Sequence, residues 1–314
     1  VEKRVSAGSG CTDCVDRQVL LELGPNNQND LPAVAAQYGL DPVPVAQVGT
    51  PPTYQMSLLT GNQNSPEQIV QSMLADARIV KPEVNRKLSV VERQGLPWTL
   101  GRSWAIGRSW AIGGSVKGFR KQWFPDRIRL DQAHLINKGK TTPQNPRNSR
   151  PIVVAVLDTG IDPDHPAFAG RLVPGFDFVG NDDDPSEEGA LHINPVYGHG
   201  THVAGLVALT APDAKIMPIR VLDGDGVGEL WRITQAIIWA GNNGADIINI
   251  SFGYNSSPEL LKDIVHVCDG VPTPTGKTFP ELTRKLVIIS GAGNSGNSEL
   301  IYPAGNRIDP QLGA

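Results

Sequence analysis

A continuous apolar run at residues 152–157, Ile-Val-Val-Ala-Val-Leu, constrains the fold of this chain more than any other feature. A strand with water on one face alternates apolar and polar side chains, whereas an unbroken run is typical of a strand covered on both faces. Further strand-like and helical patterns alternate along the chain; the strands occupy residues 215–221, 246–250 and 286–290, and the helices residues 201–209, 229–242 and 257–267. This alternation predicts an α/β domain with a mostly parallel sheet and helices on both faces.

Residues 17–86 follow a different order. Their strand-like and helical patterns succeed one another as β-α-β-β-α-β, which is the order of a small ferredoxin-like α+β domain. The second helix has a strong start signal, with Ser65 as the N-cap, Pro66 at the first helical position and Gln68 in place to complete a capping box. The last strand closes at Pro82, and because proline cannot donate to a ladder we expect an edge strand there.

These patterns divide the chain into a polar N-terminal segment (1–16), the α+β domain (17–86), a linker (87–124) and the α/β domain (125–314). The linker contains three degenerate hexads, PWTLGR, SWAIGR and SWAIGG, which would place Trp98, Trp104 and Trp110 on one face of an extended segment. They are either an aromatic strip for a partner or a short tandem duplication, whose added length costs little loop-closure entropy. We favour the duplication.

Composition narrows the function. With 28 Lys and Arg against 32 Asp and Glu, the chain lacks the basic balance of a nucleic-acid binder. No apolar run reaches the roughly 18 residues of a membrane span. Cys11 and Cys14 form a C-x-x-C and Cys268 stands alone, which matches neither a four-ligand zinc site nor a redox motif in a βαβ unit. The pair is either incidental or, in a secreted protein, a local disulfide.

Asp158, in Asp-Thr-Gly, directly follows the first buried run. Ligands of parallel sheets bind beyond the carboxyl ends of the strands, so this side chain is a candidate for chemistry, with a turn-capping Asp as the alternative. Asp-Thr-Gly is also the signature of aspartic proteases. These need two such carboxylates sharing a proton, and the sequence contains no second Asp-Thr-Gly or Asp-Ser-Gly.

Two further motifs carry polar side chains among glycines. In GHGTHVAG (198–205), His199 and His202 do not match the zincin pattern, which needs an i,i+4 pair and an adjacent Glu. The glycines around His199 predict a ring open to the site, with His202 as the buried, structural member. A carboxylate-held imidazole is a general base. Asn294, in GAGN (291–294), is either part of a glycine-rich turn or a donor to a developing oxyanion.

Together and in this order, the motifs resemble the subtilisin-like serine proteases, the subtilases. The residues that carry the resemblance are VAVLDTGIDPDHP (154–166), GHGTHVAG (198–205), ADIINISFG (245–253) and GAGN (291–294). It implies a serine endopeptidase with an Asp-His-Ser triad, in which Asp158 is the acid, His199 the general base and Asn294 the oxyanion donor, with no cofactor required. It also implies two substrate-binding strands, formed by Gly226, Val227 and Gly228 and by Ser251, Phe252 and Gly253.

The resemblance extends to the rest of the molecule. Residues 17–86 look like the inhibitory and chaperone propeptide of the family. This likeness implies a secreted, monomeric zymogen that is inhibited by its own propeptide and acts on proteins or peptides. The acidic loop at 181–188, NDDDPSEE, has clustered carboxylates that suit a structural Ca²⁺. A solvated acidic turn is the alternative.

One part of the family pattern is missing from these 314 residues. The nucleophile of subtilases lies in Gly-Thr-Ser-Met-Ala, and here Gly-Thr occurs only at 49–50 and 200–201. Loss of that serine costs a subtilase about a million-fold in turnover, so we expect the chain as given to be nearly inert. It is either a serine endopeptidase precursor whose serine lies outside this sequence or a non-catalytic fragment or pseudo-enzyme that binds peptides.

Overall fold

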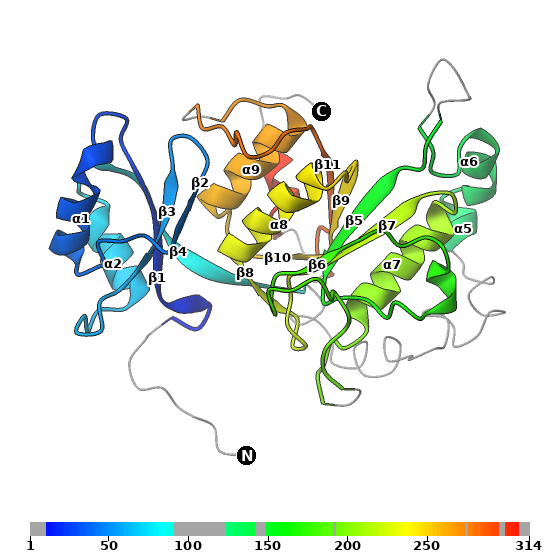
Figure 1. Cartoon of the computed structure of the whole chain (residues 1–314), viewed down its shortest axis with the longest axis horizontal. Coiled ribbons are helices and arrows are strands. Elements are labelled where there is room, and N and C mark those ends of the chain that lie inside the picture. Colours follow the sequence, from blue (N-terminus) through cyan, green and yellow to red (C-terminus); the bar gives the residue numbers. More distant parts are fainter. Residues whose placement is uncertain are drawn as a thin grey trace.

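The computed structural model describes residues 11–90, 124–141, 149–190, 193–273, 276–294 and 299–307. They form two sheets and the helices that cover them (Figure 1). The predicted Trp hexads lie outside the described residues. The N-terminal elements are β1 (Cys14–Leu23), η1 (Gln28–Asp30), α1 (Leu31–Tyr38), β2 (Ala46–Val48), β3 (Thr53–Ser57), α2 (Pro66–Met73) and β4 (Ile79–Val90).

The helices and strands that follow are α5 (Phe124–Arg127), α6 (Leu130–Ile136), β5 (Val153–Asp158), η4 (Pro166–Phe168), β6 (Phe176–Asp177), α7 (His199–Thr210), β7 (Lys215–Arg220), β8 (Val227–Glu229), α8 (Leu230–Asn242), β9 (Ile247–Ile250), β10 (Phe252–Gly253), α9 (Glu259–Asp269), β11 (Val287–Ser290) and η5 (Ala304–Arg307). Within the described residues, no helix combines the length and the apolar character that a membrane span requires.

The N-terminal unit has the predicted β-α-β-β-α-β order. Its strands are antiparallel in the spatial order β4-β1-β3-β2, and α1 and α2 cover the outer face of this sheet (Figure 1). The capping box of α2 is confirmed: the N–H of Gln68 donates to Ser65 Oγ at 3.3 Å, and the N–H of Ser65 donates to Gln68 Oε1 at 2.8 Å. A local sequence signal thus forms the local structure that it predicts.

Strand β4 is longer than the sequence indicated. Pro82 pairs with Leu21 on one side and faces no strand of the N-terminal sheet on the other, so its missing N–H is tolerated and the strand continues to Val90. The expectation that this strand closes at Pro82 was therefore wrong. β1 starts at Cys14, so the paired strands extend on both sides of the boundaries drawn at 17 and 86.

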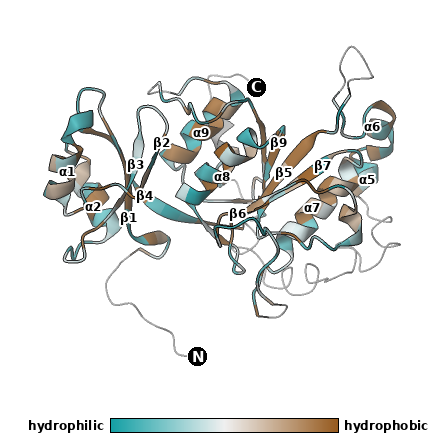
Figure 2. Ribbon diagram, viewed as in Figure 1, coloured by the Kyte–Doolittle hydropathy of each residue, from teal (hydrophilic) through white to brown (hydrophobic). Residues whose placement is uncertain are grey.

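The second sheet explains the unbroken apolar run. Its strands are parallel in the order β11-β9-β5-β7-β6, and they are mostly hydrophobic (Figure 2). Ala155 and Leu157 of β5 belong to the core shared with α8 and α9, whereas Val154 and Val156 belong to the core shared with α7. Both faces of β5 are covered, which confirms the predicted α/β fold with helices on both faces.

The cysteines take two forms. Cys11 and Cys14 are joined in a disulfide at the start of β1. Cys268 is a free, buried thiol on α9, and burial raises its pKa to about 12. A thiol with that pKa is protonated at neutral pH and is a poor nucleophile, so Cys268 is a packing residue of the core.

Candidate active site

Asp158 and His199 meet at the carboxyl edge of the parallel sheet. Asp158 is the last residue of β5 and His199 the first residue of α7. His199 Nδ1 lies 2.6 Å from Asp158 Oδ1, and the two side chains are each 1% exposed. Asp158 Oδ1 also accepts the N–H of Thr159 at 2.8 Å. A carboxylate–imidazole contact of this kind is what an acid–base pair requires.

Glycine permits this close approach of helix and strand. A Cβ on Gly200 would lie 2.1 Å from the carbonyl oxygen of Gly160 and 3.1 Å from Asp158 Cβ. Any side chain at residue 200 would therefore push the start of α7 away from the end of β5. The glycine next to His199 brings the imidazole within hydrogen-bonding distance of Asp158.

The two histidines of this motif differ from the expectation in their exposure. His199 is buried, and His202 is only partly buried. The sequence argument treated the flanking glycines as open space around the His199 ring. In the fold they let α7 pack against the end of β5, and the His199 side chain is buried. The assignment of His202 as the buried member was therefore wrong.

A second acidic side chain, Glu187, lies close to the backbone on either side of this pair. Its Oε1 accepts the N–H and the Oγ1–H of Thr201 at 3.0 and 3.1 Å. Its Oε2 accepts the N–H of Gly198 and the Oγ1–H of Thr159, both at 3.1 Å. Burial raises the pKa of Glu187, and the donated hydrogen bonds oppose this shift. Sequence reasoning missed this residue, because nothing local distinguishes it from its neighbour Glu188.

Three other carboxylates of the acidic loop have partners within the fold. Asp182 accepts the N–H of Asp184 at 2.9 Å, Asp184 accepts the hydroxyl of Ser186 at 2.5 Å, and Glu188 pairs with Arg220 at 2.8 Å. Within the part of the chain that the structure describes, this loop presents no group of three converging metal-ligand side chains. Calcium binding by this loop stays an untested prediction.

Strand β4 lies between the two strands for which substrate binding was predicted. Residues 87–90 pair antiparallel with β8 on one side and with β10 on the other. The register partners are Lys87 and Glu229, Leu88 and Gly228, Ser89 and Val227, Val90 and Phe252, and Ser89 and Gly253. The N–H of Val90 also donates to the carbonyl of Gly226 at 3.1 Å. The cleft thus holds an extended piece of the chain itself as its middle strand.

Gly226 fits this cleft for a steric reason. Its φ is +74°, and a Cβ there would lie 2.9 Å from Val90 Cγ2. On the other wall, Phe252 is buried in the same core as Leu88 and Val90. Ser251 precedes this wall, and its Oγ accepts the side-chain amide of Asn249 at 2.9 Å.

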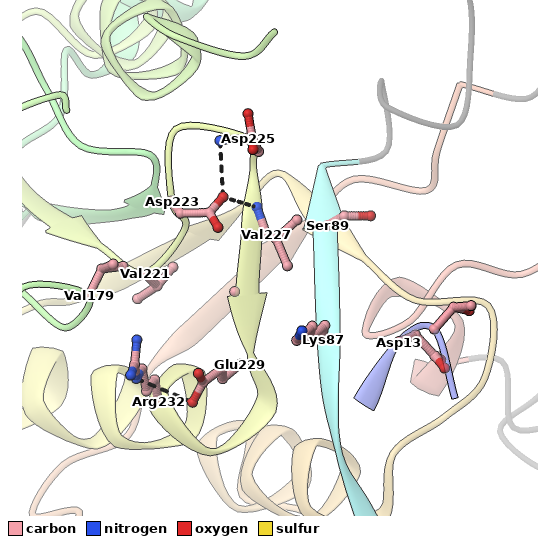
Figure 3. Close-up of a pocket in the computed structure, with 12 residues that line it drawn as sticks. Asp13, Lys87, Ser89, Val179, Val221, Asp223, Asp225, Val227, Glu229 and Arg232 are labelled. Atoms are coloured by element: carbon pink, nitrogen blue, oxygen red, sulfur yellow. Dashed lines mark hydrogen bonds and ion pairs between the residues drawn. The ribbon is translucent and has the colours of Figure 1, made fainter. Parts of the chain in front are cut away.

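The opposite face of the bound strand borders a groove of about 660 Å³. Figure 3 shows the neighbouring strands β4 and β8 side by side along it, with Asp13 beyond β4 and Asp223 beyond β8. Its charged lining residues are mostly acidic: Asp13, Asp223, Asp225 and Glu229, with Lys87 and Arg232 as the bases. Arg232 Nε lies 3.3 Å from the carboxylate of Glu229. One face of the strand in the cleft therefore packs against the apolar core, and its other face borders an acidic groove.

Asn294 lies at the same edge of the sheet as the dyad. It follows β11, which pairs with β9, and β9 pairs with β5. Asp158, Ser251 and Asn294 therefore come at or just beyond the ends of three neighbouring parallel strands. Asn294 is exposed, and its assignment as an oxyanion donor stays a prediction.

A model of the subtilase family matches residues 149–308, about half of the chain. This chain belongs to the subtilase family. Two curated relatives are thermitase of Thermoactinomyces vulgaris, 31% identical over 194 residues that cover 59% of this chain and 58% of thermitase, and subtilisin BL of Lederbergia lenta, 34% identical over 191 residues that cover 58% of this chain and 59% of that protein. The chain spans at most about three fifths of the length of these relatives.

One solved structure has a similar fold over most of this chain. Fervidolysin from Fervidobacterium pennivorans, described as a keratinolytic enzyme related to subtilisin, aligns with a TM-score of 0.58 at 21% identity. The alignment covers 94% of this chain and 42% of fervidolysin. All the site residues predicted from the sequence fall within the matched family range, and the N-terminal unit precedes it.

Proposed function

We propose that this subtilase chain carries the acid–base and substrate-binding parts of a serine endopeptidase and that residues 14–90 are its inhibitory propeptide. One observation carries the proposal: residues 87–90 are held as the middle strand of a three-stranded cleft. Strand addition of this kind is how an extended peptide binds to exposed sheet edges. The Asp158–His199 pair supplies the proton-transfer groups.

In the proposed reaction, Asp158 holds His199 through its Nδ1–H, so that Nε2 is left to take a proton from a serine hydroxyl. The same carboxylate stabilises the imidazolium that forms. Asn294 donates its side-chain amide to the oxyanion of the tetrahedral intermediate. The serine lies in a part of the protein outside the given sequence.

Anchoring of the proposed propeptide explains how it inhibits. The Glu83 carboxylate of β4 accepts the N–H groups of Glu259 and Leu260 at 3.0 and 2.9 Å, at the start of α9. Asn85 Oδ1 accepts the N–H of Trp231 at 3.2 Å, near the start of α8. These contacts satisfy backbone donors that a helix leaves unpaired at its N-terminus. They fix β4 just before it enters the cleft.

The bound strand also indicates the substrates. Leu88 and Val90 are fully buried, whereas Lys87 is exposed on the acidic side of the cleft. We therefore propose unfolded or extended segments of proteins as substrates, with apolar side chains at two positions separated by one residue. Secretion is supported by the Cys11–Cys14 disulfide, because disulfides persist in oxidising compartments.

The test is to read the coding sequence beyond position 314 and to assay the complete product. We expect it to hydrolyse casein and to be labelled by a fluorophosphonate, and we expect both activities to disappear in Asp158→Asn and His199→Gln. Asp164→Asn, an exposed carboxylate in the loop after β5, is the matched control and keeps both. A folded complete product with neither activity would refute the endopeptidase proposal.

The cleft also supports a second function that needs no nucleophile. A groove that pairs with both edges of a peptide is by itself a peptide-binding site, and the pairing of β4 with β8 and β10 is the observation in favour. A complete product without a serine nucleophile would then bind a fluorescent peptide of the β4 sequence saturably and leave it uncut.

A further inference from the structure

Glu187 connects the two segments that carry the candidate dyad. It lies in the acidic loop, and the N–H of Glu187 donates to the carbonyl of Ile161 at 3.0 Å. Its carboxylate accepts hydrogen bonds from Thr159, which follows Asp158, and from Gly198, which precedes His199. One side chain thus bridges the end of β5 and the start of α7.

Both threonine hydroxyls of this network also accept a backbone N–H. Thr159 Oγ1 accepts the N–H of Gly200 at 3.0 Å, and Thr201 Oγ1 accepts the N–H of Asp162 at 2.8 Å. Because each hydroxyl already accepts a backbone N–H, its own proton is directed to the Glu187 carboxylate. Four donors therefore converge on two oxygens, and each oxygen accepts two hydrogen bonds. Four donated hydrogen bonds favour an ionised carboxylate, which is an acceptor only.

We propose that Glu187 is the positioning residue of this site. It holds the backbone on either side of His199 and the residue after Asp158, and this keeps the Asp158 and His199 side chains within hydrogen-bonding distance. The inference rests on the proposed function for its catalytic meaning. Glu187 does not touch either ring or carboxylate of the dyad through these contacts; it acts through Thr159, Gly198 and Thr201. Hydrogen bonds to a charged group are among the strongest in proteins, which suits this role.

The isosteric variant Glu187→Gln removes the charge and replaces one acceptor oxygen by an NH₂ group. That group would face two N–H or O–H donors and could accept from neither. We expect either the two Thr201 contacts or the Thr159 and Gly198 contacts to be lost, according to which oxygen is replaced, and the Asp158–His199 hydrogen bond to loosen. The matched control is Glu188→Gln, the same change one residue along, where the side chain is 66% exposed and pairs with Arg220.

The experiment is proton NMR of the ¹⁵N-labelled 314-residue chain, read at the downfield Nδ1–H of His199 and assigned by its loss in His199→Gln. In Glu187→Gln we expect this proton to move upfield and to exchange with water on the order of tenfold faster. In Glu188→Gln we expect no change. A folded Glu187→Gln chain with an unmoved resonance and unchanged exchange would overturn the inference.

A second pair of variants covers the case in which Glu187→Gln does not fold. Thr201→Val removes the hydroxyl that joins Asp162 to Glu187, and Thr201→Ser retains it. We expect faster exchange of the His199 proton in the valine variant and recovery in the serine variant. Equal exchange in both would count against the role of this network. The readout needs no nucleophile, so an inactive complete product with this response would refute only the protease proposal.

Discussion

Lys277 offers the sharpest test of how the N-terminal unit is held. Its ammonium group is fully buried and donates to Glu22 Oε2 at 2.7 Å, to the Pro51 carbonyl at 2.6 Å and to Thr53 Oγ1 at 2.7 Å. Three donors meet three acceptors, all of them on the N-terminal unit. Burial lowers the pKa of Lys277, and Glu22 opposes that shift.

The variant Lys277→Met leaves the Glu22 carboxylate, 2% exposed, without its cation. Removing one partner of a buried pair costs about 3–5 kcal/mol, because the other charge stays desolvated. Replacing both partners by apolar groups is often neutral, so Glu22→Leu combined with Lys277→Met should recover most of that loss. The non-additivity of the two changes measures the pair.

The assay is urea unfolding at pH 7 of the intact chain, followed by tryptophan fluorescence and circular dichroism. Lys285→Met, at an exposed lysine between α9 and β11, is the control and should change the free energy of unfolding by less than about 0.5 kcal/mol. The reasoning fails if Lys277→Met loses less than about 1 kcal/mol, or if the double variant loses as much as Lys277→Met alone.

Three further variants test other parts of the structure. Burial raises the pKa of Glu83 from 4.5 to about 7, so the folded chain keeps a proton that the unfolded chain releases. Ionisation of this residue should therefore lower the free energy of unfolding by at most about 3 kcal/mol as the pH rises from 4.5 to 7. Urea unfolding measured across this pH range should show the loss in the parent chain and not in Glu83→Gln. Leu88→Ala should cost about 2–5 kcal/mol and increase hydrogen exchange in β4; unchanged protection would refute the buried cleft position. Ser65→Ala should lose about 1 kcal/mol of capping, and an unchanged urea midpoint would contradict it.

The parts of the fold that could be predicted depend on neighbours in the sequence. The capping box joins Ser65 and Gln68, and the unbroken run before Asp158 reports that both faces of its strand are covered. Motif order placed Asp158 and His199 as a candidate pair, and the structure brings them into contact. Their catalytic roles stay proposals.

The parts that could not be predicted depend on residues far apart in the chain. Lys277 and Glu22 are 255 positions apart, and no local pattern marks either as buried. Glu187 and Glu188 look alike in an acidic loop, yet one bridges two backbone segments and the other pairs with Arg220. Residues 87–90 were assigned to a linker, because the partners that make them a strand come from residues 227–253.

Strand β4 joins the N-terminal unit to the cleft: its first part pairs with β1 and its last part with β8 and β10. The occupant of the cleft is thus a tethered ligand with almost no linker. For such a ligand the effective concentration is on the order of millimolar. A free peptide present at micromolar concentration will therefore lose the competition even if its intrinsic affinity is equal. Under the proposed function, detachment of the whole N-terminal unit therefore controls access to the cleft, and the four residues 87–90 need only a weak affinity of their own to keep the cleft closed.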